Sequence, residues 1–590
     1  MLLAVSHIGL SSANFNGPPQ EIPAKQWAQY QAESSKGILE LQPFRSVSRV
    51  ELAGAGAARG SATLVDLNPS VEVWFLLSIE EPAKVQTRNF HLENPRPLEQ
   101  HPRLAGGAAD RVLRIEGLAG GEPCELWRAE GAGAESDART LEQASRSDLP
   151  YAPLCGGRLY LRNPVVGHRT PLERITDYLR DHVFGGEKII SFVKEEVYQD
   201  AFLERGVERP AAQCGSPDSK ASDLPSAAAV SAQSLGRCLV PGSFGLDAVG
   251  TAAGWAPGAW YRVRDLPGVF ASTVMPANLP PALLGGSEPH VNRLDAVESQ
   301  AFVYLVAFDL SEFELHFALG TEHPRLDWSS RPPEGVRDPR LPGPDGVASA
   351  APLVRNGVVA FSDIDRTVAT FAGGFRREHG AFRYGPLALV NHGSHYGFIE
   401  EGVIFSKLEP GLATIVVRTD GHLAMKTWTQ SDDASLASIR YARQNGVPLI
   451  EGDPLRRTGI PGRLVNLWGQ GNWSGSVDEA LRTVRAGACV QEGGSHRFLL
   501  YGYFSAATPS AMARVFQAYG CRYAMQLDLN ALEHTYLALY VHRSGERLVE
   551  HLVQGMEQCD SRTPDGIAPR FLTAPDDRDF FYFTRRQVSR

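Results

Sequence analysis

Alternating apolar and polar positions predict β-strands along much of the second half of the chain. Strands are expected at residues 301–310, 313–320, 412–428 and 497–504. Asp420-Gly421, inside the third stretch, is a hairpin signal. A helix is expected at 508–520, which begins with Thr-Pro and ends at a glycine. We therefore predict an α+β fold, in which residues 290–590 form a domain with a large mixed sheet and packed helices.

A strand predicted at 523–529 keeps polar residues on one side. Gln526, Asp528 and Asn530 alternate with apolar residues, and side chains along a strand point alternately to opposite faces. A buried carboxylate costs free energy unless it is paired or hydrogen-bonded. Asp528 is therefore either a satisfied structural group or an acid that faces a cleft, where the downstream His534 could join it.

The first half of the chain is expected to be organised differently from the second. The predicted parts are a loose polar leader (1–45), a mixed α/β N-terminal region (46–289) and the domain at 290–590. An Ala/Ser/Pro-rich linker at 209–236 and a Pro/Gly/Ser-rich break at 279–289 separate compact stretches. Thr170 and Glu173 form a capping box that predicts a helix, which we interpret as structural.

Composition narrows the class of protein. The 590 residues carry a net charge of −9 without a basic stripe, which argues against nucleic-acid binding. Hydrophobic residues make up 43%, enough for a sizeable core, but no stretch of about 18 apolar residues predicts a transmembrane helix. The first residues, MLLAVSHIGL, lack the basic n-region of a secretory signal peptide.

The seven cysteines bear on the cellular compartment. None forms a C-x-x-C pair, so a zinc knuckle is not expected. The pairs Cys124/Cys155 and Cys214/Cys238 could be disulfides, which would imply an oxidising compartment; the alternative is buried reduced thiols. Because the number is odd, at least one thiol is left over.

Two further segments carry groups that suit a polar ligand. Gly373-Gly374 follows a predicted strand and could present backbone amides to an anion, although a tight turn would have the same sequence. The consecutive Arg443, Gln444 and Asn445 could donate several hydrogen bonds to a sugar or a phosphate, or could form an exposed helix end.

Three histidines, His379, His392 and His395, lie close together in the sequence. Their spacing fits no metal-binding signature, and H-E-x-x-H is absent. We therefore predict neither a metal nor another cofactor.

The order of these motifs resembles the phosphodiester glycosidase family. The segments that carry the resemblance are FAGGF (371–375), the Asp-Gly hairpin followed by a tryptophan, RQNGVPLIEG (443–452) and GCRYAMQLDLN (520–530). They span about residues 300–545. In better-known members an asparagine precedes the two glycines, where this chain has Ala372. Asp528 is retained, whereas Leu529, Asn530 and Ala531 replace a glycine run.

The resemblance implies an exported bacterial hydrolase, periplasmic or secreted, that acts on a sugar phosphodiester or another glycosidic bond of a glycan. Asp528 and His534 would be catalytic. The binding of a carbohydrate or sugar-phosphate substrate would fall to Gly373, Gly374, Arg443, Gln444, Asn445 and Asn530. Glycosidases usually need two carboxylates, and Glu533 and Asp420 are candidates for the second. The alternative is a non-catalytic polysaccharide-binding or structural envelope protein on the same fold.

Overall fold

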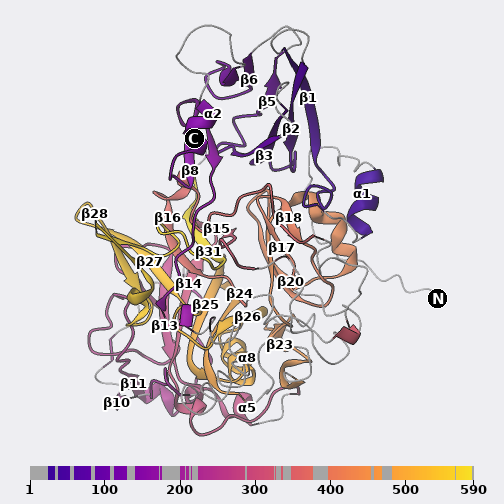
Figure 1. The fold of residues 1–590 in the computed structure, drawn as a ribbon. Coiled ribbons are helices and arrows are strands. Elements are labelled where there is room, and N and C mark those ends of the chain that lie inside the picture. The colour runs from indigo at the N-terminus through magenta and orange to yellow at the C-terminus, as the bar shows by residue number, and fades with distance from the viewer. Residues whose placement is uncertain are drawn as a thin grey trace, which may run out of the picture.

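The computed structural model of the chain describes residues 24–32, 37–53, 59–80, 87–106, 112–128, 140–171, 173–175, 178, 200–205, 207–210, 214–215, 224–285, 289–324, 326, 334–336, 347–375, 396–452, 458–467, 481–493, 495–564 and 566–587. Within these residues the fold is rich in β-strands (Figure 1). Four sheets of five to eight strands dominate it.

The largest sheet crosses the body of the molecule. Its order is β12 (Tyr261–Arg262), β13 (Val269–Val274), β14 (Val303–Asp309), β25 (His496–Ala507), β24 (Thr483–Gly493), β26 (Tyr523–Leu529), β22 (Ile450–Glu451) and β23 (Ile460–Pro461). Every pair of neighbours in it is antiparallel, so the expectation of a mixed sheet was wrong for these strands. The β24–β25 hairpin, a connection that only antiparallel strands permit, lies at its centre.

Two five-stranded sheets complete the body. One has the order β15 (Phe313–Ala318), β31 (Phe580–Arg585), β16 (Thr367–Ala372), β27 (Leu537–Arg543) and β28 (Glu546–His551). The other has the order β18 (Val403–Ser406), β17 (Phe398–Glu400), β21 (Ile439–Gln444), β19 (Ala413–Arg418) and β20 (Leu423–Thr427). The Asp420-Gly421 turn joins β19 to β20, which confirms the predicted hairpin.

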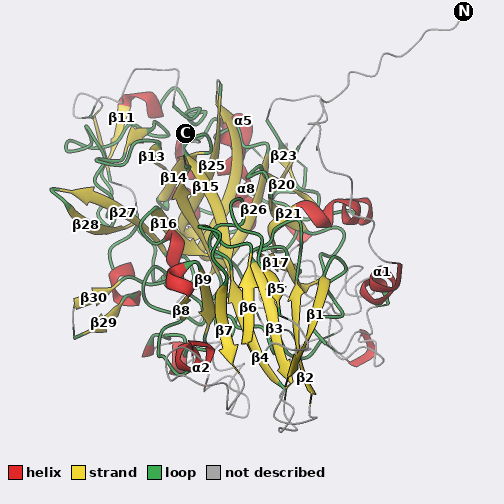
Figure 2. Cartoon of the chain, turned by 90° about the horizontal axis from the view of Figure 1, so that it is seen from above, coloured by secondary structure: helices red, strands yellow, loops and turns green. Residues whose placement is uncertain are grey.

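The N-terminal strands form a separate lobe, seen at the top of Figure 1 and in front in Figure 2. Its six-stranded sheet has the order β1 (Ser46–Ala53), β2 (Arg59–Asp66), β3 (Trp74–Glu80), β4 (Arg88–Glu93), β9 (Leu159–Arg162) and β8 (Tyr151–Leu154). A three-stranded sheet contains β5 (Arg103–Ala105), β6 (Val112–Glu116) and β7 (Cys124–Arg128). The Trp74 ring meets Phe405 of β18 edge-on, and this contact joins lobe and body.

The small elements are α1 (Ala24–Gln31), α2 (Thr140–Ser145), α5 (Pro281–Leu284), α8 (Pro509–Ala518), the pair β10 (Glu208–Pro210) and β11 (Arg237–Leu239), and the pair β29 (Ser561–Thr563) and β30 (Gly566–Ala568). Helix α8 confirms the helix predicted at 508–520. The Thr508 hydroxyl accepts a hydrogen bond from the Ala511 N–H, and Gly520 has a left-handed φ of 72°. No helix among the residues that the structure describes is long and apolar enough to cross a membrane.

Part of the expected leader is packed against the body. Ile38 and Leu41 are buried, and the Gln42 side chain exchanges two hydrogen bonds with the backbone of Ile404 in β18, at 2.7 and 2.8 Å. This anchoring gives residues 37–45 a structural role in place of the loose character that their polarity suggests. Residues 1–23 lie outside the described part of the chain.

The boundary expected at residue 290 falls between two paired strands. β13 and β14 are joined by a register of six residue pairs, from Val269–Phe308 to Val274–Val303. A fragment that starts at 290 lacks β12 and β13 and leaves the wholly buried strand β14 as an open edge. Exposed apolar edge strands promote aggregation.

We therefore expect a 290–590 fragment to be insoluble, or to lack the cooperative melting of the full chain. A fragment that starts at 237 retains β12 and β13 and serves as the matched comparison. Solubility and circular-dichroism melting of both fragments would test this expectation. A soluble 290–590 fragment that melts cooperatively would show that β14 does not need its neighbour.

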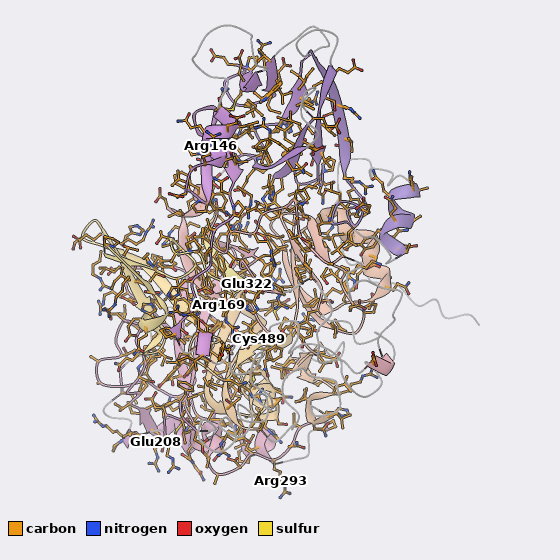
Figure 3. The ribbon with its side chains drawn as sticks, in the orientation of Figure 1. Arg146, Arg169, Glu208, Arg293, Glu322 and Cys489 are labelled. Atoms are coloured by element: carbon orange, nitrogen blue, oxygen red, sulfur yellow. A yellow bond between two sulfur atoms is a disulfide. The ribbon has the colours of Figure 1, made fainter. Side chains whose placement is uncertain are left out.

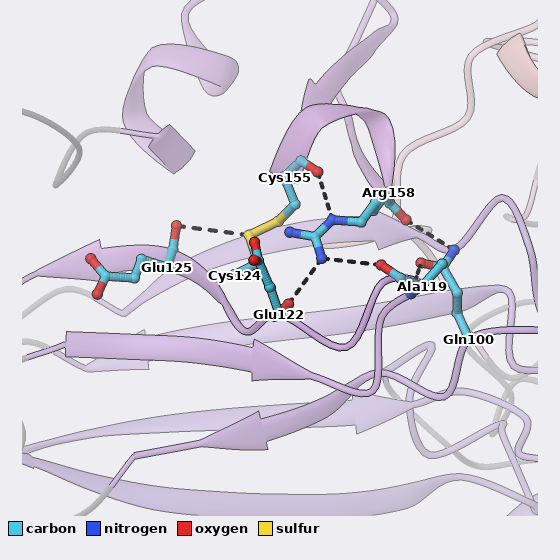
Figure 4. The surroundings of a disulfide bond; sticks show 7 residues. All are labelled: Gln100, Ala119, Glu122, Cys124, Glu125, Cys155 and Arg158. Atoms are coloured by element: carbon cyan, nitrogen blue, oxygen red, sulfur yellow. Dashed lines mark hydrogen bonds between the residues drawn. A yellow bond between two sulfur atoms is a disulfide. The ribbon is translucent and has the colours of Figure 1, made fainter.

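Two disulfides are present. One joins Cys124 to Cys155 in the N-terminal lobe and was one of the two predicted pairs. Arg158 holds the surrounding loop by donating hydrogen bonds to the carbonyls of Cys155, Ala119 and Glu122 (Figure 4). Cys489 of β24 is bonded to Cys521, a pairing that was not predicted (Figure 3). The other predicted pair is not bonded in this structure: Cys214 and Cys238 are both thiols.

Replacing Cys124 and Cys155 together by serine should lower the free energy of unfolding by roughly 3–4 kcal/mol, because the bond closes a loop with a sequence separation of 31. Chemical denaturation would measure the change. The variant Cys559→Ser, which removes a thiol outside any disulfide, is the control. A double variant as stable as the parent would contradict a stabilising role for the bond.

Candidate functional site

The guanidinium of Arg578 is the centre of a buried polar cluster. Arg578 lies in the turn before β31, and only 4% of it is exposed. Nε donates to Glu173 at 2.8 Å, one terminal nitrogen donates to Asp528 at 3.0 Å, and the other donates to Nε2 of His534 at 2.5 Å. One cation thus joins the strand acid, the downstream histidine and a residue of the N-terminal region.

Asp528 is the last residue but one of β26, His534 lies in the segment that follows, and both are hydrogen-bonded to Arg578. One carboxylate oxygen of Asp528 accepts the Leu529 N–H at 2.8 Å, and the other accepts Arg578. Nδ1 of His534 lies 2.7 Å from the Leu529 carbonyl and therefore carries the proton. Since Nε2 accepts from Arg578, the imidazole is neutral, with a lone pair directed at the cation.

Glu173 reaches this cluster from the capping box. Its backbone N–H donates to the Thr170 hydroxyl at 3.2 Å, and its carboxylate accepts the Thr170 N–H at 3.0 Å, which confirms the predicted cap. The same carboxylate pairs with Arg578. Burial acts to raise the pKa of Glu173, but Arg578 and Arg570 outweigh it and hold the pKa below its usual value. The helix that we interpreted as structural therefore also supplies an ionised group to the site.

Glu533 has the opposite electrostatic environment. Burial and the neighbouring Glu173 raise its pKa above the usual value. Ligand atoms of Glu173, Glu533 and His534 all lie within 4.8 Å of one another. Two acids whose pKa values are pushed apart at close range are an arrangement that some acid–base catalysts use.

The same three side chains could in principle coordinate a metal ion. Arg578, however, already donates to Glu173 and to Nε2 of His534, so a cation would have to displace a guanidinium from both. The charge of Arg570, whose guanidinium lies 3.9 Å from Glu173, adds to the repulsion. The two guanidinium groups therefore disfavour a metal ion at this position. His379, His392 and His395 lie outside the described residues.

A short segment of the N-terminal region anchors Glu173 to the turn that carries Arg578. His168 and Asp576 form an isolated parallel β-bridge, in which the His168 backbone N–H donates to the Pro575 carbonyl at 2.8 Å. Arg169 forms an ion pair with Asp577 at 2.6 Å and another with Glu322. Arg169 and Glu322 are labelled in the middle of the molecule in Figure 3. The N-terminal region is thus part of the site.

The glycine pair Gly373-Gly374 and the Arg443–Asn445 segment both contact Asp579, the residue after Arg578. The Gly373 N–H donates to the Asp579 backbone at 2.9 Å, and Arg443 donates to the Asp579 carboxylate at 2.7 Å. A side chain at Gly373 would lie 2.6 Å from that carboxylate, so only glycine fits. Asn445 donates to the carbonyls of Gln526 and Leu527 in β26. The three predicted motifs therefore converge on residues 576–579.

Hydrogen bonds within the protein occupy most of the groups predicted to bind substrate. Arg443, Gln444 and Asn445 are fully buried. The Gln444 amide accepts from Gly397 and Glu409 and donates to Glu409 and Thr414, which uses its whole capacity. Gly374 has a φ of 151° and lies against Asn445. Asn530 follows β26 with a left-handed φ of 79°, so it does not continue the polar face of that strand.

Sequence reasoning missed three of the most important residues. These residues are Arg570, Arg578 and Asp579. Arg570 donates two hydrogen bonds to the Asp576 carboxylate and one to the Glu533 carbonyl. The available signal was the run Asp-Asp-Arg-Asp at 576–579, placed directly before the apolar strand β31. Four consecutive charges at the start of a buried strand need partners. Burial and Arg570 act in opposite directions on Asp576, and burial raises its pKa to about 7.

No protein-family model and no curated protein matches the chain. The chain resembles solved structures only weakly. The catalytic domain of zebrafish N-acetylglucosamine-1-phosphodiester alpha-N-acetylglucosaminidase, auto-inhibited by its pro-peptide, has a TM-score of 0.29 and 11% identity, over 55% of this chain and 85% of that one. A hypothetical protein from Synechocystis has a TM-score of 0.26 and 11% identity, over 87% of this chain and 97% of that one.

Proposed function

We propose that the protein hydrolyses a sugar phosphodiester or another glycosidic bond of an envelope or extracellular glycan. The observation that supports this most is the cluster of Asp528, His534, Glu533 and Glu173 around Arg578. It combines an acid, a neutral imidazole and two carboxylates with different proton affinities, near the end of β26.

Each group has a role in this proposal. Asp528 is the acid–base or orienting carboxylate, and His534 is the neutral partner, whose Nε2 accepts a proton only when Arg578 is displaced from it. Glu533, whose pKa burial raises, is the second carboxylate that a glycosidase needs. Asp420 is less suited to that role, because it is exposed at the β19–β20 hairpin.

The export of the enzyme is part of the same proposal. Two disulfides are compatible with a periplasmic or extracellular location, where oxidised cysteines persist. Cell fractionation with an antibody against the native protein would test it, and recovery in the cytoplasmic fraction alone would contradict export.

One observation favours the alternative, a non-catalytic glycan-binding or structural protein. Asp528 is 5% exposed, and both its oxygens already accept hydrogen bonds within the protein. Turnover of a panel of sugar-1-phosphodiesters by the purified full chain, measured beside glycan-array binding, separates the two functions. Turnover supports the hydrolase, and binding without turnover supports the alternative.

Glu533 sets an expected pH dependence. If Glu533 donates a proton to the leaving group, activity should fall as the pH rises through its elevated pKa. Glu533→Gln should remove this alkaline limb and reduce kcat by about 10²–10⁴-fold. Glu546→Gln, at an exposed position in β28, is the control. An unchanged pH–rate profile in the Glu533 variant would exclude this residue as the acid.

A further inference from the structure

The two unlinked thiols Cys214 and Cys238 lie next to each other where the large sheet ends. The Cys214 thiol donates to the Arg237 carbonyl at 3.4 Å, and that carbonyl belongs to the peptide group that leads into Cys238. The Cys238 thiol donates to the Ala253 carbonyl at 3.8 Å, beside the Gly254 carbonyl that accepts from Gly215, the residue after Cys214. The Cys238 thiol points at Gly254, where an added side-chain carbon would lie 2.6 Å from the sulfur.

The segment that carries Cys214 covers the last strand of the eight-stranded sheet. Gly215 donates to the Gly254 carbonyl at 3.1 Å, and its own carbonyl accepts the Tyr261 hydroxyl of β12 at 3.1 Å. On the other side, β11 continues into two backbone hydrogen bonds between Leu239 and Trp255, both 2.8 Å. Residues 214–215 and β11 thus cover this end of the sheet, whereas the backbone edge of β12 itself is hydrogen-bonded by Asp247 and Val249.

We propose that Cys214 and Cys238 form a third, reversible disulfide that clamps this edge cover onto the sheet. The cover then exists in two states, held by hydrogen bonds alone when the thiols are reduced and by a covalent bond when they are oxidised. This clamp is independent of the proposed hydrolase activity, because it lies on β11 and β12 and shares no residue with the Arg578 cluster.

The chemistry is thiol–disulfide exchange with an oxidant that carries a disulfide, such as glutathione disulfide. The half-buried Cys214, deprotonated, attacks one sulfur of the oxidant and releases a thiolate, which leaves a mixed disulfide on Cys214. Deprotonated Cys238 then attacks the Cys214 sulfur and releases the second thiolate. The protein loses two protons and two electrons, and the oxidant is reduced to two thiols. Burial and Cys238 raise the pKa of the Cys214 thiol to about 12, so little of it is thiolate at neutral pH and the first exchange step is slow.

The test exposes the reduced full chain to glutathione disulfide, blocks remaining thiols in denaturant and maps the peptides by mass spectrometry. We expect a cross-linked Cys214–Cys238 peptide in the parent and in Cys559→Ser, and none in Cys214→Ser. Hydrogen exchange of residues 207–215 and 254–262 should slow on oxidation in the parent only. Complete blocking of both thiols, a persistent mixed disulfide at Cys214, or a link to Cys559 would each overturn the proposal.

Discussion

Replacing Arg578 by methionine is expected to lower the free energy of unfolding by about 3–5 kcal/mol. Methionine fills a similar volume but leaves the buried carboxylates of Glu173 and Asp528 without their common cation. An uncompensated buried charge is among the most destabilising changes that a single substitution can make. Urea denaturation of the parent and the variant at neutral pH would measure the difference.

The effect should depend on pH in a defined direction. The pKa of Glu173 in the folded protein is held below its usual value of 4.5. The stabilisation from this group is therefore fully present above pH 4.5 and is lost as the pH falls through the folded-state pKa. The gap between parent and Arg578→Met should therefore narrow below about pH 4.5. Arg49→Met, which breaks an exposed pair with Glu80, should cost less than about 1 kcal/mol. A variant of Arg578 that is as stable as the Arg49 control would contradict the central role of the cluster.

The substitution Asp528→Asn should reduce turnover of a sugar-1-phosphodiester by about 10²–10⁴-fold, the usual contribution of an acid–base group. It should also lower stability by roughly 1–3 kcal/mol, because a single amide oxygen must replace two carboxylate oxygens that accept from Leu529 and Arg578. Kinetics must therefore be measured well below the melting temperature of the variant. Steady-state rates and thermal melting on the same preparation separate the two effects.

Asp420→Asn is the matched control for this experiment. Asp420 is an exposed acid on the β19–β20 hairpin, and its carboxylate accepts only the local His422 N–H among the hydrogen bonds of the described residues. Neither rate nor stability should change by more than a small factor. A folded Asp528→Asn protein with full activity would remove Asp528 from the catalytic role, and the structural interpretation of the cluster would stand.

The local features of the chain were predictable from its sequence. The Thr-Pro start and glycine end of α8, the Asp-Gly hairpin between β19 and β20 and the Thr170–Glu173 capping box all depend on residues close together in the chain. Such signals reflect backbone preferences and short-range hydrogen bonds, which a neighbouring residue can satisfy. The alternation around Asp528 also predicted correctly that this acid would need a partner.

The partners themselves were decided by the tertiary structure. The sequence separations between Asp528 and Arg578, and between Glu173 and Arg578, are 50 and 405. No periodicity in the chain relates residues so far apart, because their encounter depends on how β26, β31 and the N-terminal segment pack together. The same packing paired β13 with β14 across the expected boundary and turned Gln444 inward, where its amide is fully hydrogen-bonded. Burial makes each charge in the site costly unless another charge is brought to it, and only the assembled fold brings Arg578 to both carboxylates.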